Sequence, residues 1–241
     1  MASFIKLKNT PVKEIIFTIS FKEDIPMEKL DIFKSSSEIA KRFPTVGKGF
    51  NTQLEAKGNE QPTSKTFLDG YVLRCPPPLS RIIQARRGSF SFHKINGYEN
   101  FEILIKELYE YWDILVQSVG SLTVNNLSVR YLNFIVMNSG EEINDILTIH
   151  TTHPFGKAIE SNFLQYKFKY DANPEIDTTV ITAKGNEGTQ SGIVLDIILN
   201  KKIRDEQNKD AFFSYFFDMR KAKNDLFFRS ITENTIIKYN Q

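Results

Sequence analysis

Few residues of this sequence have the type and spacing that catalysis or metal binding requires. Cys75 is the only cysteine, and three prolines follow it, so it would act as a nucleophile only if His93 or His150 folded beside it. His150 and His153 are close in sequence, but no further ligand lies near them, whereas zinc sites use three or four protein ligands. We therefore expect a loop with two incidental histidines, and we predict no catalytic residue, no metal site and no cofactor.

A basic hairpin is the strongest candidate for ligand binding. Residues 81–86 and 89–95 alternate like strands, and Gly88 supplies the turn between them. The hairpin carries four cations and no acid: Arg81, Arg86, Arg87 and Lys94. These cations suit a phosphate or an acidic partner; the alternative is a solvated edge whose charge discourages strand pairing. Phe90 and Phe92 do not have the register of an RNA-recognition strand, so we expect them to face the core.

Asp196 interrupts the apolar run 192–200, which is predicted to be a strand. An isolated buried carboxylate is costly, so Asp196 must pair with a cation such as Arg130 or face solvent. Because Asp196 alternates with Leu195 and Ile197, we favour its placement on the opposite, solvent-facing side of the strand.

Composition limits the classes of function. The chain has 241 residues, and its 31 basic and 29 acidic side chains give a formal net charge of +2, so nucleic-acid binding would need a local basic patch. A single cysteine excludes an internal disulfide. No apolar stretch is long enough for a signal peptide or a membrane-spanning helix. We predict a cytoplasmic protein that does not associate with a membrane.

Strands of alternating polarity and a few amphipathic helices account for most of the chain. Predicted strands cover residues 14–21, 66–73, 81–86, 89–95, 128–137, 163–170, 177–184 and 192–200. Predicted helices cover residues 26–43, 100–119 and 208–227. Residues 45–65 are rich in polar residues and glycine and predict a long surface loop.

This order predicts an α+β fold with a largely antiparallel sheet packed by amphipathic helices. We expect one domain, 1–241. Each half ends in a long amphipathic helix, so two similar halves, 1–122 and 123–241, are an open alternative.

Four diagnostic segments are spread along the chain, at residues 10–17, 84–90, 129–134 and 223–232. They contain a proline and a glutamate at the first strand, an Arg-Tyr pair midway, and a closing Phe-Phe segment with Ile-Thr. In this order they resemble a sporadically distributed prokaryotic family of uncharacterised proteins of about this length. The resemblance implies an α+β fold and a partner encoded by a nearby gene. Phe134 departs from it, because the family often has a polar or basic residue there.

We therefore expect a non-enzymatic protein-binding or regulatory module, such as the accessory or antitoxin-like component of a bacterial defence or toxin system. The alternative is a nucleotide- or nucleic-acid-binding protein, or an enzyme, that uses the basic hairpin. The residues predicted to bind a ligand or partner are Arg86, Arg87, Arg130 and Lys223.

Overall fold

The computed structural model describes residues 7–55, 63–98, 100–149, 163–206 and 209–241. The strands are β1 (Val12–Phe21), β2 (Thr45–Glu55), β3 (Thr63–Arg74), β4 (Arg81–Arg86), β5 (Ser89–Ile95), β6 (Val124–Val136), β7 (Phe163–Tyr170), β8 (Asn173–Glu187) and β9 (Gln190–Glu206). The helices are α1 (Met27–Ser35), α2 (Ser37–Arg42), α3 (Phe101–Val119), α4 (Ile143–Ile146), α5 (Lys209–Ser230) and α6 (Glu233–Lys238).

All of these strands form one sheet, in the order β2-β3-β4-β5-β1-β6-β9-β8-β7. Every neighbouring pair is antiparallel. β1 and β6 lie together in the middle, and β2 and β7 form the two edges. The predicted α+β class with an antiparallel sheet is confirmed.

The two halves of the chain repeat one topology about the β1–β6 boundary. In the first half, the chain leaves β1, forms β2 to β5, and β5 returns beside β1 before α3. In the second half, the chain leaves β6, forms β7 to β9, and β9 returns beside β6 before α5. The first half has one additional strand, at the β2 edge. A single sheet nevertheless continues through both halves.

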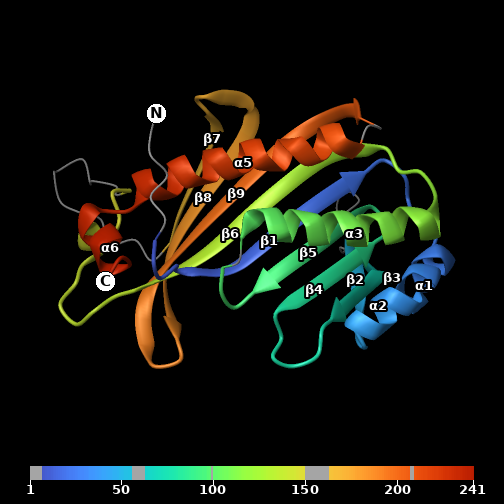
Figure 1. Cartoon of the computed structure of the whole chain (residues 1–241), viewed down its shortest axis with the longest axis horizontal. Helices are drawn as coiled ribbons and strands as arrows, with labels where there is room; N and C mark the ends of the chain where they lie inside the picture. Colours follow the sequence, from blue (N-terminus) through green and yellow to red (C-terminus); the bar gives the residue numbers. More distant parts are fainter. Residues whose placement is uncertain (1–6, 56–62, 99, 150–162, 207–208) are drawn as a thin grey trace.

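The long helices α3 and α5 lie across the same face of the sheet (Figure 1). Phe17 of β1 shows this directly, because its ring lies 5.7 Å from the ring of Phe101 in α3 and 5.5 Å from that of Phe216 in α5. We call this the covered face, and the face without α3 and α5 the open face. The hydrophobic core contains both aromatic and aliphatic side chains, among them Phe17, Phe101 and Phe216.

Helix α3 has the two ends and the buried apolar stripe that its sequence predicts. The Asn100 side chain accepts a hydrogen bond of 2.8 Å from the Glu102 amide, and Gly120, at φ +95°, ends the helix. The predicted apolar stripe of this helix is buried throughout: Leu104, Leu108, Tyr111, Trp112, Leu115 and Val119.

The prediction of a loop over residues 45–65 is wrong, because 45–55 and 63–65 belong to strands β2 and β3. The physical reason is that this hairpin extends past β4, which pairs with β3 only over residues 70–74. Side chains beyond that point are exposed on both faces, so alternation of polarity, the usual signal of a strand, is weak.

Three smaller differences concern element boundaries. The helix predicted over 26–43 is interrupted at Ser36, which separates α1 from α2. The turn predicted from Gly185 lies further along the chain, because β8 continues to Glu187 and Gly188 adopts φ +59°. Helix α6 was not predicted; its side-chain cap is Thr232, which accepts from the Thr235 amide.

Candidate functional site

The arginines of the basic hairpin are paired with acids. Arg86 donates from Nη1 to Asp69 at 3.1 Å, and Arg87 donates from Nη2 to Asp24 at 2.6 Å. The prediction that the hairpin lacks a nearby acid is therefore wrong. Its sequence contains none, but the acids come from β3 and from the segment before α1.

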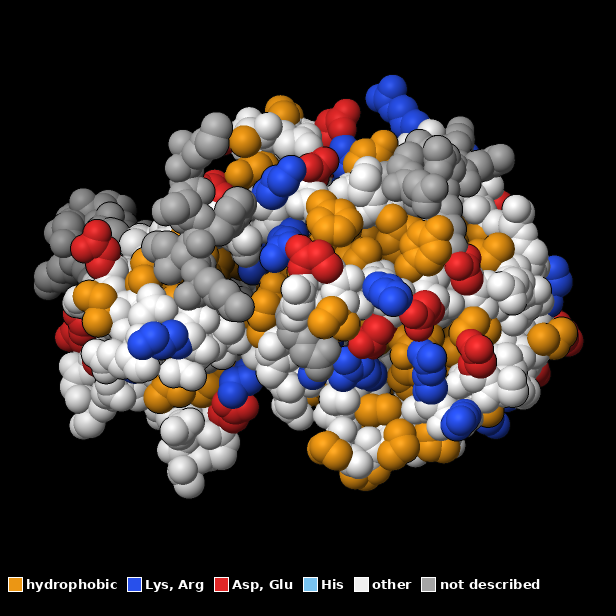
Figure 2. Space-filling view, viewed as in Figure 1, with side chains coloured by type: hydrophobic (Ala, Val, Ile, Leu, Met, Phe, Trp, Pro, Cys, Tyr) orange, Lys and Arg blue, Asp and Glu red, His pale blue; other side chains and the backbone are white. Residues whose placement is uncertain are grey.

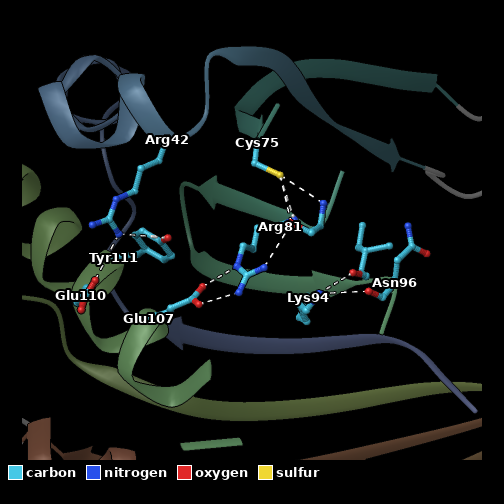
Figure 3. Close-up of polar contacts among 10 residues, drawn as sticks. Arg42, Cys75, Arg81, Lys94, Asn96, Glu107, Glu110 and Tyr111 are labelled. Atoms are coloured by element: carbon cyan, nitrogen blue, oxygen red, sulfur yellow. Dashed lines mark hydrogen bonds and ion pairs between the residues drawn. The ribbon is translucent and has the colours of Figure 1, made fainter. Parts of the chain in front are cut away.

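A third ion pair ties the hairpin to helix α3 on the covered face (Figure 3). Arg81 donates from Nε and Nη2 to the two carboxylate oxygens of Glu107, each at 2.8 Å. Lys94, which is buried, donates to the backbone carbonyls of Ile95 and Asn96. The Arg81–Glu107 pair therefore links the hairpin to α3, whereas Lys94 binds backbone carbonyls at the end of its own strand.

Cys75 lies at the end of β3 in the same region (Figure 3). Its sulfur accepts hydrogen bonds from the backbone amides of Ser80 and Arg81, both at 3.3 Å. Burial acts to raise the pKa of this thiol, but those hydrogen bonds and the charge of Arg81 outweigh it and lower the pKa. His93 is not the general base that a nucleophile would need, because its ring nitrogens contact Glu14 and Gln84.

A continuous polar row crosses four strands and reaches the open face. Nδ1 of His93 lies 2.7 Å from Glu14 on β1, and its Nε2 lies 3.2 Å from Nε2 of Gln84 on β4. Oε1 of Gln84 in turn accepts from Arg86, which reaches Asp69 on β3. We call Asp69, Arg86, Gln84, His93 and Glu14 the polar row. Each side chain in it is restrained by at least one other.

Arg130 of β6 also lies on the open face, since it alternates with the buried residues Val129 and Tyr131. It binds Asp196 of β9, which is only 3% exposed. The hydrogen bond to Asp196 and the nearby charge of Glu14 raise the pKa of Arg130. The face predicted for Asp196 is correct, but its exposure to solvent is not, because the guanidinium covers it.

The four residues predicted to bind a ligand or partner do not converge. Arg86 and Arg130 share the open face but have separate acids, and Arg87 lies at the β4–β5 turn. Lys223 belongs to α5 and is buried where that helix covers the sheet, with its ammonium over the ring of Tyr131. No single pocket of cations forms from these residues.

A further feature, which was not predicted from the sequence, is the arm, which we define as residues 50–55 of β2 and 63–68 of β3. In the arm each strand has only the other as a neighbour, because β2 is the sheet edge and the pairing of β3 with β4 ends at Gly70. Phe50 is 57% exposed and Leu54 is 76% exposed, and they lie on one face of β2. An isolated two-stranded hairpin is at best marginally stable in water. The arm therefore lacks the covering that such side chains normally have.

Within the described ranges, no group of three or more His, Cys, Asp or Glu side chains is placed to hold a metal ion. The pair formed by His150 and His153 lies outside the described residues. None of the helices in the described part of the chain is long and apolar enough to cross a membrane.

Comparison with known proteins identifies no family. No family model matches the chain, and no curated protein matches it. Among solved structures, the chain is similar to the di-domain ARO/CYC protein StfQ from the steffimycin biosynthetic pathway. The two are 10% identical, the match covers 94% of this chain and 96% of that one, and the TM-score is 0.22.

Proposed function

We propose that this protein is a non-enzymatic binding module that docks another protein on the arm. The observation that carries the proposal is the exposure of Phe50 and Leu54 on an edge strand that pairs on one side only. Edge strands present unpaired N–H and C=O groups, and a partner strand binds by completing that ladder. Contacts with the side chains of Phe50 and Leu54 would make the binding of such a strand specific.

The two edges of the sheet differ in a way that favours β2 as the docking edge. The opposite edge, β7, carries Lys167 and Lys169 at alternating positions, and charges of this kind discourage strand addition. The stretch of β2 from Gly49 to Leu54 contains no charged residue and no proline. We therefore propose that the occupant is an uncharged, extended segment of a partner protein whose apolar side chains cover Phe50 and Leu54.

The family resemblance is consistent with this proposal. A scattered distribution fits a partner encoded by an adjacent gene, and an accessory or antitoxin-like role in a bacterial defence or toxin system is the form that we favour. The proposal includes a cytoplasmic location. It is preferred over nucleic-acid binding because the arginines of the basic hairpin have acidic partners, and because basic and acidic side chains are interspersed on the covered side (Figure 2).

The test uses the intact chain as bait in its native host, beside a double variant, Phe50→Ser with Leu54→Ser. The matched control, Phe163→Ser with Phe168→Ser, removes two exposed aromatic residues from the other edge, where they are 58% and 41% exposed. A recovered protein is then purified and recombined with each form, and hydrogen exchange of the β2 amides is measured. We expect the parent and the control to bind the recovered protein, and we expect the bound protein to protect their β2 amides from exchange.

Three outcomes would contradict the proposal. The first is a partner that binds the arm variant as well as the parent. The second is binding that leaves the β2 amides unprotected. The third is self-association of the purified chain that depends on Phe50 and Leu54, which would identify a second copy as the occupant.

A further inference from the structure

Lys223 occupies a position on α5 where an apolar residue is expected. It follows Phe216 by two helical turns and precedes Phe227 by one, and both phenylalanines are buried. Lys223 itself is 8% exposed. Its Nζ lies 4.3 Å from the centre of the Tyr131 ring and 6.0 Å from that of Phe227. Among the residues that the structure describes, no carboxylate forms an ion pair with it.

The hydroxyl of Tyr131 is a second unpartnered group at the same place. Tyr131 is 0% exposed, and its hydroxyl has no hydrogen-bond partner within the described chain. Buried polar groups in folded proteins nearly always have partners, and each exception has a cost of desolvation. The two exceptions belong to neighbouring residues, because the ammonium of Lys223 lies over the ring that carries the unpartnered hydroxyl, so one bound group could serve both.

The charges around this pair set the chemistry of that partner. Arg220, one turn before Lys223 on α5, lies 2.5 Å from a carboxylate oxygen of Glu102 on α3, and Tyr98 lies near Arg220. The charges of Arg220 and Glu102 cancel. A protonated Lys223 therefore leaves the cluster with one positive charge, which one singly charged anion would neutralise.

We propose that Lys223 and Tyr131 form an internal binding site for a monocarboxylic acid with an apolar body. One carboxylate can accept hydrogen bonds from both the ammonium and the phenol. A phosphate ester would bring a second negative charge that nothing in the described cluster neutralises. The buried ring of Phe227, 6.0 Å from the ammonium, suits a hydrocarbon or aryl body rather than a sugar or a nucleotide.

The site also predicts a proton-linked affinity. Burial and the positive charge of Arg220 lower the pKa of Lys223 to about 7. A bound carboxylate would raise that pKa, because it stabilises the ammonium form. Above the pKa of the free protein, binding must therefore take up a proton, and affinity falls about tenfold for each pH unit until the pKa of the complex is reached.

The test uses octanoate as the probe and octanol as its neutral match. Binding to the full chain is measured by calorimetry at about pH 8 in buffers of different ionisation enthalpy, which reports the number of protons taken up. We expect octanoate, and not octanol, to bind with uptake of close to one proton. Lys223→Met should weaken octanoate about 100-fold, and Tyr131→Phe about tenfold, as expected for losing a charged and a neutral donor. Lys221→Met, an exposed change on the same helix, should have no effect.

Lys223→Met replaces a buried cation with an apolar side chain and is expected to fold. A loss of octanoate binding in this variant would therefore not be due to unfolding. The proposal is overturned if octanoate does not bind the parent, if octanol binds as tightly, or if Lys223→Met binds octanoate with unchanged affinity. It is also overturned if binding takes up no proton. If octanoate does not bind the parent, ordered water alone would supply the hydrogen-bond partners of Lys223 and Tyr131.

Discussion

The guanidinium of Arg130 binds the carboxylate of Asp196 across the β6–β9 boundary. Nε lies 3.0 Å from both carboxylate oxygens, and Nη2 lies 2.6 Å from one of them. The partners differ in burial: the side chain of Arg130 is 44% exposed and that of Asp196 only 4%. Asp196 therefore depends on a cation that remains accessible to solvent.

Removing only the cation should be destabilising. Arg130→Met leaves a buried carboxylate without its partner, so we expect a loss of about 2–4 kcal/mol in the free energy of unfolding, reduced from a fully buried pair by the exposure of Arg130. Combining it with Asp196→Leu should recover most of that loss. Urea denaturation of both single variants and the double variant measures the coupling. A double variant as unstable as Arg130→Met would show that the pair is not what stabilises this position.

Gly70 of β3 pairs with Arg86 of β4. It has φ +153°, and an added Cβ would lie 2.1 Å from the carbonyl oxygen of Ala85, a backbone atom that cannot move aside. Gly70→Ala should therefore destabilise the fold by about 2–4 kcal/mol. The matched control is Gly49→Ala in the paired strand, where the nearest atom to a new Cβ is at an ordinary 3.5 Å. Equal melting temperatures for the two variants would contradict the close approach.

The arm should open far more readily than the centre of the sheet. Amides in 51–54 and 63–66 lie where β2 and β3 have only each other as neighbours, whereas β1 lies between β5 and β6. We expect hydrogen exchange in the arm to be about 100-fold faster or more than in β1, because local opening there exposes little additional apolar surface. Mass spectrometry of the free protein measures both regions in one experiment. Equal protection would show that the arm is stable without a partner.

The covered face could be predicted from the sequence because its residues alternate. Ile15, Phe17 and Ile19 are every second residue of β1, and all are fully buried. Helix α3 was equally clear, since Asn100 and Gly120 mark its ends. These signals are local, so they do not depend on knowing which strands are neighbours.

The partners of the charged side chains could not be predicted, because they are distant in sequence. Asp24 is 63 residues from Arg87, and Glu107 is 26 residues from Arg81. The arm was missed because a hairpin that buries neither face has no alternation. The burial of Lys223 was missed for a different reason: the helical spacing indicates a buried position, but lysine normally indicates the surface.

Lys223 should make the stability of the protein depend on pH above neutrality. Its pKa is about 7 when folded, against 10.5 for an ordinary lysine in the unfolded chain. Between these values the unfolded state holds a proton that the folded state has lost, so the free energy of unfolding rises with pH. The contribution of Lys223 to the free energy of unfolding is greatest above the pKa of lysine in the unfolded chain. It falls as the pH drops toward 7 and is constant below pH 7. At about 1.4 kcal/mol per unit, its full extent is on the order of 5 kcal/mol.

Lys223→Met tests this dependence, because methionine fills a similar volume and has no charge to desolvate. The variant should be more stable than the parent at about pH 6, by several kcal/mol, and the difference should shrink as the pH rises toward 10. Lys221→Met, at an exposed position, should follow the parent at every pH. Chemical denaturation across this range gives all three curves. Parallel curves for the parent and Lys223→Met would mean that Lys223 keeps its ordinary pKa in the folded protein, and that its ammonium has a partner there.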